Sequence, residues 1–262
     1  MKEEKNKMKK TKIDWCDCTI NPVVGCKNGC EYCYAEKLNK RFNFIDEWSK
    51  PQFFPERLQQ LCAKSPKSIF IDSMSDCGHW TIPQIRKIAE AINDNPQHNY
   101  ILLTKRPDLF IEKCKLIVED ANHGNIWVGT TITRREDFNR LLFLPIYAHR
   151  FVSVEPLLED LGDLSKEKCD LFNLPYIPEV IIIGAETGNR KSKIVVQKEW
   201  VKNIVDSANA FNEMLNSNSY EGIIMRKNNW KPVMIFMKES LKDTMGNDFR
   251  QDKLPWNFEK ER

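Results

Sequence analysis

Three cysteines lie close together in the stretch GCKNGCEYCYAEK, which covers residues 25–37. Cys26, Cys30 and Cys33 have the spacing C-x3-C-x2-C. Three thiols are an odd number for a disulfide framework and one short of the four ligands of a structural zinc site. Three thiolates can bind three irons of a [4Fe–4S] cluster and leave the fourth iron open to a ligand from outside the protein. The spacing therefore predicts a working metal site rather than a structural one.

Zinc is the alternative metal for this stretch, with Cys16, Cys18, Cys77 or His79 as the fourth ligand. Common zinc pairs have the spacing C-x2-C, and the first interval here is one residue longer. The spacing favours the cluster. Anaerobic reconstitution with iron and sulfide distinguishes the two, because only the cluster gives a coloured protein.

The composition and the start of the chain predict a cellular compartment in which these thiols stay reduced. The chain has 262 residues, 41% of them hydrophobic, and its 40 basic and 37 acidic residues leave a net charge of +3. That balance does not by itself indicate nucleic-acid binding. The lysine-rich start lacks the apolar run of a signal peptide, and no window approaches the roughly 18 apolar residues of a membrane span. We expect a cytoplasmic protein with no membrane partner, whose clustered cysteines are ligands or reactive groups.

Short apolar runs alternate with helical patterns along the chain. The runs are continuous, as is typical of parallel strands covered on both faces. They lie at 68–72, 99–104, 125–132, 150–155, 179–186 and 232–238, with a weaker run at 12–20, and the helical patterns lie at 34–42, 83–95, 106–122, 135–145 and 197–216. This order predicts an α/β fold, a complete or partial (β/α) barrel of six or seven parallel strands. An open doubly wound sheet is the alternative.

No linker divides the chain, so a single domain is expected. Residues 1–12 read as a disordered basic tail, and residues 13–262 as one α/β domain. The segments 157–178 and 215–231 read as long connections inserted into that domain. The sequence does not indicate an oligomeric state.

The cysteine stretch resembles the motif of the radical S-adenosylmethionine (SAM) enzymes, in which an aromatic residue, here Tyr32, precedes the last cysteine. The resemblance implies a radical-SAM-like barrel in which the methionyl amine and carboxylate of S-adenosylmethionine chelate the open iron. It also implies that an electron donor such as flavodoxin or ferredoxin supplies an electron. The cofactor is then cleaved to a 5′-deoxyadenosyl radical, which abstracts a hydrogen atom from substrate.

Further blocks resemble one small group within that superfamily, the phage and bacterial proteins of unknown function with a three-cysteine motif. The blocks TINPVVGC, CEYCYAEK, SMSD, LLTKRP, SVEPLL, IIGAETG and FMKES run from about residue 13 to residue 240. Members of the group usually have Trp-Thr-x-x-Thr-Trp-Asn-Pro before the motif, whereas this chain has WCDCTINP. Cys16 and Cys18 depart from the pattern, and their role stays open.

The resemblance implies that S-adenosylmethionine lies across the carboxyl ends of the strands. Serines after the second strand are expected to meet the methionyl amine, and threonines after the fourth to meet the ribose. Each of these residue types is also common in loops or strands for structural reasons alone. A glutamate after the fifth strand and the flexible GAETG turn after the sixth complete the pocket. The expected cofactor contacts are Tyr32, Ser73, Ser75, Thr130, Thr131, Glu155, Gly184 and Glu186.

Two residues are expected to act on the substrate. Cys77 follows the second strand and is a candidate hydrogen-atom donor to a product radical, with a buried thiol as the alternative. Lys238 ends the last strand and is expected to face the substrate, with an edge residue that reaches solvent as the alternative.

Basic residues recur after successive strands, and Trp80 and Tyr176 are available to stack a base. Converging cations suit phosphate. We therefore expect a nucleic acid or nucleotide substrate, with modification or repair of a base as the reaction. A small molecule or peptide is the alternative substrate, and a non-radical metal-binding or redox-sensing protein is the alternative function. The basic residues are Lys105, Arg106, Arg134, Arg135, Arg190, Lys191, Lys193 and Lys238.

Overall fold

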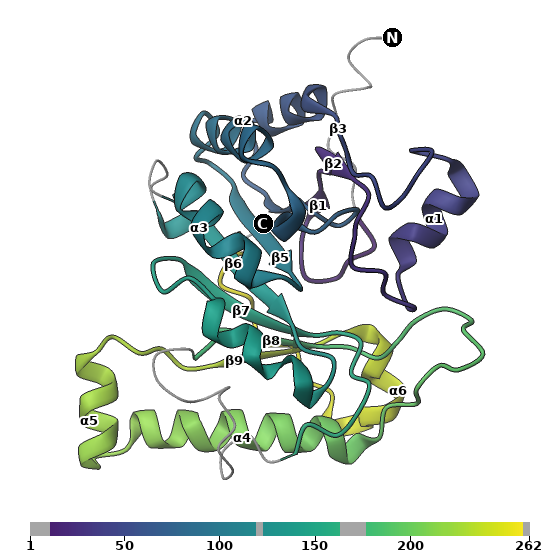
Figure 1. The fold of residues 1–262 in the computed structure, drawn as a ribbon. Coiled ribbons are helices and arrows are strands. Elements are labelled where there is room, and N and C mark those ends of the chain that lie inside the picture. The colour runs from purple at the N-terminus through teal and green to yellow at the C-terminus, as the bar shows by residue number, and fades with distance from the viewer. Residues whose placement is uncertain (1–10, 119–122, 163–176, 259–262) are drawn as a thin grey trace. The chain divides into compact units, whose positions relative to one another are not determined.

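The computed structural model describes residues 11–118, 123–162 and 177–258. It contains a seven-stranded parallel sheet in the order β1-β4-β5-β6-β7-β8-β9, with helices in most of the described connections between the strands (Figure 1). This arrangement is an α/β fold and confirms the predicted class of a partial (β/α) barrel. The chain divides into two compact units. Unit 1 takes its residues from 1–130, 147–149 and 255–262, and unit 2 from 131–146 and 150–254.

Unit 1 contains the cysteines and the first four strands of the sheet. The strands β1, β4, β5 and β6 pair side by side and in parallel. A short antiparallel pair, β2 with β3, flanks the cysteines. The elements are β1 (Cys18–Thr19), β2 (Val23–Val24), α1 (Tyr34–Phe42), β3 (Gln52–Phe53), η2 (Pro55–Cys62), β4 (Ser68–Phe70), η3 (Cys77–His79), α2 (Ile82–Asn93), β5 (Asn99–Thr104), α3 (Pro107–Val118), η4 (His123–Asn125) and β6 (Ile126–Thr131).

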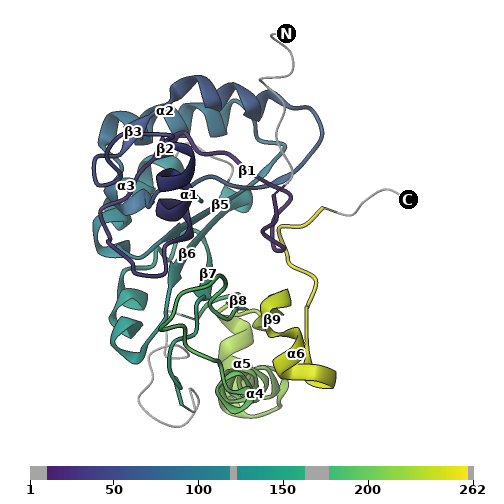
Figure 2. The ribbon, with the colours of Figure 1, turned by 90° about the vertical axis from the view of Figure 1, so that its right-hand side faces the viewer.

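The helix α2 shows how the sequence specifies unit 1. Pro83 lies in its first turn, and the Thr81 amide donates a hydrogen bond to the Gln84 side chain at 2.8 Å, which caps the helix. Its apolar face, predicted from 3–4 spacing, is buried as expected at Ile85, Ile88, Ala89 and Ile92. The helices α2 and α3 pack against each other beside the strands of unit 1 (Figures 1 and 2).

Unit 2 contains the last three strands, again parallel and side by side as β7-β8-β9. The long helix α4 packs against β9 and α5. The elements are η5 (Arg135–Phe143), β7 (His149–Val154), β8 (Val180–Ile183), α4 (Lys198–Asn216), α5 (Tyr220–Lys227), β9 (Met234–Met237), η6 (Glu239–Leu241), α6 (Lys242–Met245) and η7 (Gly246–Asp248).

Three sequence-based expectations differ from the structure. The weak first run forms only the two-residue strand β1. The pattern at 135–145 forms the 3-10 helix η5 rather than an α-helix. The stretch 215–231, expected to be a connection, contains the helix α5, whose first turn is capped by the Ser219 hydroxyl.

No helix among the described residues is long and apolar enough to cross a lipid bilayer. Residues 1–10, which cover most of the predicted tail, lie outside the described residues, as does most of the connection 157–178.

Candidate metal centre

The cysteine loop, residues 25–33, connects β2 to α1, the helix that was predicted to follow it. Gly25 has φ 110°, and a Cβ atom there would lie 2.8 Å from the Trp48 carbonyl oxygen, so only glycine fits. Gly29 has φ 65°, with open space around it. Cys33 is the N-cap of α1. The loop therefore owes its path to two glycines and to the start of a helix.

Backbone amides point at two of the three sulfurs. The Asn28 amide donates to Cys26 Sγ at 3.5 Å, and the Glu36 amide donates to Cys33 Sγ at 3.4 Å. Amide hydrogen bonds to sulfur stabilise thiolates and help to set the reduction potential of iron–sulfur clusters. This donor set fits a cluster held by thiolates.

The pKa values of two of the three thiols, Cys26 and Cys33, are raised in the loop. Burial raises the pKa of the Cys26 thiol to about 12, with the Asp76 charge and the neighbouring thiols adding to the rise. Burial likewise raises the pKa of Cys33. At these two cysteines the positive charge of a bound metal would favour the thiolate form.

No three His, Cys, Asp or Glu side chains within the described residues converge on one metal position. A single zinc ion requires such convergence, because all its ligands meet at one atom. Three thiolates on a cluster each bind a different iron and do not have to converge on one. The preference for a cluster over zinc stays a prediction from the C-x3-C-x2-C spacing.

A second loop, residues 71–80, lies against the cysteine loop, and we call it the aspartate loop. The Gly25 amide donates to the Met74 carbonyl at 2.9 Å, and the Tyr34 hydroxyl donates to the Ser73 carbonyl at 2.7 Å. Asn21 Oδ1 accepts from the Ser73 hydroxyl at 3.0 Å and from the Met74 amide at 2.8 Å. The structure therefore brings Ser73 beside the cysteines, as expected for a residue near the methionyl amine.

Ser75, the other serine expected there, accepts a hydrogen bond from the Trp80 indole at 3.0 Å. Trp80 is only 1% exposed, so it is a core residue and the expectation that it stacks a base is wrong. Tyr176, its expected companion, lies outside the described residues.

Asp76 is the hub of the aspartate loop. Its buried carboxylate accepts hydrogen bonds from the Asn28 side chain at 2.5 Å, the Thr104 hydroxyl at 2.5 Å, and the Gly78 and Lys105 amides, both at 2.9 Å. Because Asn28 lies between the first two cysteines, this one carboxylate ties the cysteine loop to the end of β5.

His79 extends the same network. Its Nε2 lies 2.7 Å from Asn28 Oδ1, and since the Asn28 amide nitrogen donates to Asp76, the imidazole N–H is the donor. Asn28 and Asn21 are the site residues that sequence reasoning missed. The only available signal was an asparagine inside a motif block, which is common in loops for local reasons.

Cys77 is fully buried beside Asp72, and burial raises its pKa well above the usual value. This position favours the buried-thiol alternative over hydrogen-atom donation. Asp72 is also buried, and it accepts hydrogen bonds from the Leu103 and Cys77 amides. Its carboxyl group therefore holds the loop to β5 and does not face a ligand.

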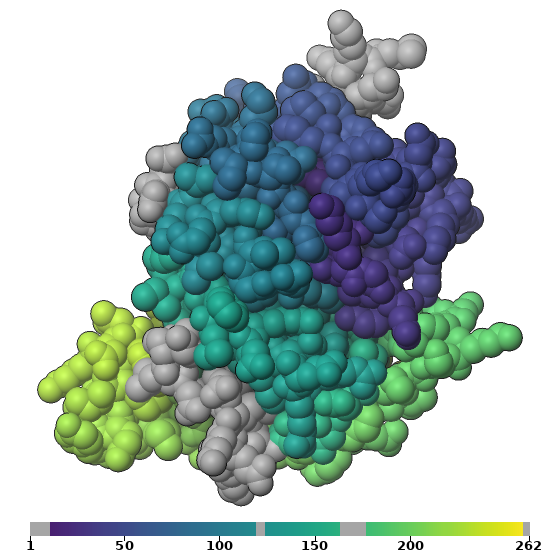
Figure 3. All heavy atoms as spheres, in the orientation of Figure 1, coloured from purple at the N-terminus to yellow at the C-terminus, as the bar shows by residue number. Residues whose placement is uncertain are grey.

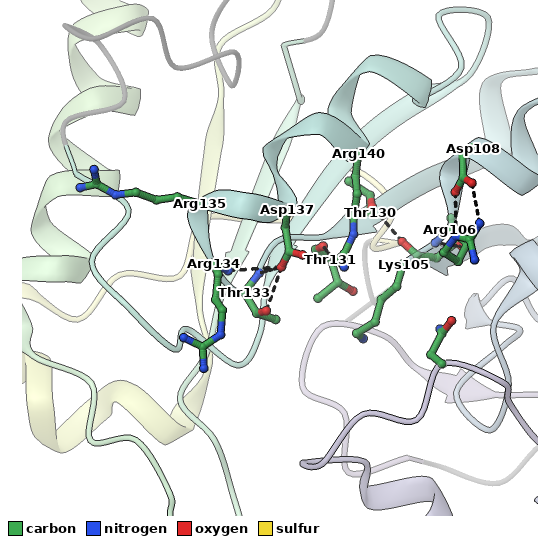
Figure 4. Close-up of polar contacts among 12 residues, drawn as sticks. Lys105, Arg106, Asp108, Thr130, Thr131, Thr133, Arg134, Arg135, Asp137 and Arg140 are labelled. Atoms are coloured by element: carbon green, nitrogen blue, oxygen red, sulfur yellow. Dashed lines mark hydrogen bonds and ion pairs between the residues drawn. The ribbon is translucent and has the colours of Figure 1, made fainter.

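Three further residues were expected to contact the cofactor, namely Tyr32, Thr130 and Thr131. Lys105 Nζ lies 5.7 Å from the centre of the Tyr32 ring, so Tyr32 is within reach of a cation at the cysteine loop. Thr130 is fully buried, and its hydroxyl donates to the Thr104 carbonyl at 2.8 Å (Figure 4). Thr131, in unit 2, is 1% exposed. These threonines occupy strand-packing positions, and their contact with a ribose stays a prediction.

A separate cluster forms at the carboxyl ends of β7, β8 and β9 in unit 2. Lys238 Nζ lies 2.5 Å from Glu155 Oε1, and a Cβ atom at Gly184 would lie 3.0 Å from Lys238 Cδ and 3.1 Å from Glu155 Cγ. Gly184 therefore makes room for this ion pair. The buried Glu186 binds the Arg190 guanidinium through both oxygens, at 2.7 and 2.8 Å.

Four of the eight basic residues expected after successive strands are paired with acids, namely Arg106, Arg134, Arg190 and Lys238. In unit 1, Arg106 binds Asp108 through two hydrogen bonds (Figure 4). In unit 2, Arg134 lies 3.4 Å from Glu159, whose carboxylate also accepts from the Arg135 amide. Lys191 and Lys193 are exposed. These pairs reduce the positive field that the sequence suggested.

Comparison with known proteins gives a family whose function is unknown. Searches of curated proteins and of solved structures found no match. A family model described as a protein of unknown function (DUF5131) matches residues 10–221, and the chain therefore belongs to that family.

Proposed function

We propose that the chain is a radical S-adenosylmethionine enzyme in which Cys26, Cys30 and Cys33 bind a [4Fe–4S] cluster. The observation that carries the proposal is the cysteine loop. Three half-buried thiols lie between Gly25, a position that accommodates only glycine, and the N-terminus of α1. Backbone amides donate hydrogen bonds to two of the three sulfurs. The C-x3-C-x2-C spacing and the motif blocks along the chain support the same function.

When bound, such a cluster supplies the electron that cleaves S-adenosylmethionine to a 5′-deoxyadenosyl radical. The chain's own residues hold and orient the reactants. The three thiolates bind three irons and leave one for the cofactor, while Asp76 fixes the cysteine loop through Asn28. Ser73 and Ser75 offer polar atoms beside that loop for the methionyl amine.

The substrate in this proposal is a nucleic acid base or a nucleotide, modified or repaired in the cytoplasm, with flavodoxin or ferredoxin as electron donor. Its support is the positive charge beside the cysteine loop. Burial lowers the pKa of His79; the Asp76 charge opposes this, and the charges of Arg106, Lys27 and Lys113 lower it further. Cations gathered at one site favour a ligand that carries phosphate.

Anaerobic reconstitution tests the metal assignment. The wild-type chain is expected to bind about four irons and to turn brown. A Cys30→Ala variant should lose most of this iron. Cys62→Ala is the matched control, since Cys62 is an exposed cysteine outside the loop. A wild-type chain that stays colourless, or that binds zinc in preference to iron, contradicts the proposal.

A further inference from the structure

The outer face of α1 carries a row of exposed apolar side chains. Tyr34, Leu38 and Phe42 follow one another at four-residue intervals and are 49%, 36% and 55% exposed, and Phe44 just beyond the helix is 45% exposed. The opposite face of α1 buries Ala35 and Asn39. The helix lies at the right-hand margin of unit 1 in Figure 1, and Figure 3 shows its atoms at the molecular surface. Exposed apolar rows of this kind mark binding surfaces.

Cations are interleaved with these rings. Residues 34–44 contain three basic residues, Lys37, Lys40 and Arg41, and one acidic residue, Glu36, which pairs with Lys40 at 2.8 Å. The Arg41 guanidinium lies 5.0 Å from the centre of the Phe42 ring, and Phe42 and Phe44 lie 5.8 Å apart, centre to centre. The face therefore combines stacking surfaces with a positive charge.

This combination fits one class of ligand. Proteins that bind single-stranded nucleic acid stack successive bases on aromatic rings and follow the phosphates with cations. Three of the four exposed apolar side chains here are aromatic. The bases of a duplex are already stacked on one another and do not stack on these rings. An apolar protein partner carries no charge that would pair with the cations beside them.

The position and length of this row of side chains suit a bound single strand. Tyr34 directly follows Cys33, and the Tyr34 hydroxyl is held by the Ser73 carbonyl, so its ring is fixed next to the cysteine loop. At about 1.5 Å per residue, the eight steps from Tyr34 to Phe42 span about 12 Å, enough for several stacked bases. A strand bound along α1 therefore ends at the cysteine loop.

We propose that the outer face of α1 binds single-stranded nucleic acid and leads one base to the cysteine loop. This inference rests on the proposed function for the purpose of the binding, and it narrows the substrate to a single strand. The contacts involve bases and phosphates, which DNA and RNA share.

Fluorescence anisotropy of the reconstituted full-length chain tests the binding, with labelled DNA and RNA single strands of about twelve nucleotides and the matching duplex. The single strand is expected to bind more tightly than the duplex. Phe42→Ala should weaken binding by about ten-fold, and Phe42→Ala with Phe44→Ala by more. Lys37→Gln with Arg41→Gln should flatten the dependence of log affinity on log salt by about 1.4, or about 0.7 per phosphate contact.

Matched controls come from α5 in unit 2, where Tyr220 is 76% exposed and Lys227 is exposed. Tyr220→Ala and Lys227→Gln should bind as the wild type does. All substituted side chains are exposed, so thermal unfolding should be unchanged. A single strand that contains 2-aminopurine should lose fluorescence on binding the wild type, and less on binding Phe42→Ala.

Equal affinity for single strand and duplex, or unchanged binding by the phenylalanine variants, overturns the inference, as does the absence of binding at low salt. The last outcome would leave a protein or a nucleotide as the ligand. Iron content measured in the same samples separates the two proposals. A chain that holds iron but binds no strand fails only this inference, and one that binds the strand but never holds iron fails only the proposed function.

Discussion

The side-chain amide of Asn28 donates a hydrogen bond to the Asp76 carboxylate at 2.5 Å, and that carboxylate also accepts from the backbone amide of Lys105 at 2.9 Å. One buried acid thus fixes the turn between the first two cysteines to the end of a central strand. The path of the cysteine loop therefore depends on this contact as well as on its two glycines.

Replacing Asp76 with alanine is expected to destabilise the protein by about 3 kcal/mol, because its buried donors lose their acceptor. Iron retention after reconstitution should fall as well, since the cysteine loop loses its anchor. Urea unfolding and iron content measure the two effects. Asp108→Ala is the control, because its pair with Arg106 is exposed and contributes no more than about 0.5 kcal/mol. Equal effects of the two substitutions would contradict the anchor role.

The two glycines of the cysteine loop should respond differently to alanine. Gly25→Ala meets the Trp48 carbonyl at 2.8 Å as well as an unfavourable φ, and should cost about 3 kcal/mol or prevent folding. Gly29→Ala has open space around it and should cost only the left-handed backbone penalty of about 1–2 kcal/mol. Thermal unfolding of both variants checks this order, and a Gly29→Ala variant less stable than Gly25→Ala would contradict the loop geometry.

Because the Asp72 carboxyl group is buried, we expect the free energy of unfolding to decrease as pH rises. Burial raises its pKa in the folded state well above the usual value. Below the unfolded pKa of about 3.9 the group is protonated in both states. As pH rises, the unfolded chain loses this proton first, and the free energy of unfolding decreases until the folded-state pKa is passed. Asp72→Asn removes the effect, so its stability relative to wild type should increase with pH from about 4 upward.

Urea unfolding at several pH values measures this difference. Asp252 provides a contrast of opposite sign. Burial opposes ionisation there, but the hydrogen bonds from Arg250 and Ile235 lower its pKa overall. Its contribution is present above the unfolded pKa and is lost as pH falls. A stability difference between wild type and Asp72→Asn that does not change with pH would mean that the Asp72 pKa is not raised.

The Glu155–Lys238 pair in unit 2 should show measurable coupling. Their side chains are 26% and 16% exposed, so a double-mutant cycle with Glu155→Gln and Lys238→Met should give about 1–2 kcal/mol, between exposed and buried pairs. Gly184→Ala should weaken this coupling, because the added Cβ presses on both side chains. Full coupling in the Gly184→Ala background would show that the pair does not need the space that glycine leaves.

Much of the fold could be predicted from local pattern. The strand Asn99–Thr104 and the helix Tyr34–Phe42 have the predicted bounds, since each is specified by its own residues. The pair of β2 with β3 could not be predicted, because each strand has two residues and they pair only across the intervening loop and helix. The helix α5 was missed because it has only eight residues and lies among asparagines, serines and lysines.

Some features of the candidate site could likewise be predicted from local sequence, and others could not. The cysteine loop stands out through spacing alone, because few structural roles need three thiols in eight residues. The role of Asn28 depends on a carboxylate 48 positions away, and no local pattern reveals it. Thr130 looked available for a ligand because a sequence does not show that its hydroxyl binds the Thr104 carbonyl.

The yield of 5′-deoxyadenosine tests the central claim most directly. Reconstituted, reduced protein incubated with S-adenosylmethionine should release it, and the Cys30→Ala variant, with one of the three proposed iron-binding thiolates removed, should release none above background. Cys62→Ala should match the wild type. Cleavage by the wild type that never exceeds that of Cys30→Ala, in a sample that contains the full complement of iron, would contradict the account and leave a metal-binding protein without radical chemistry.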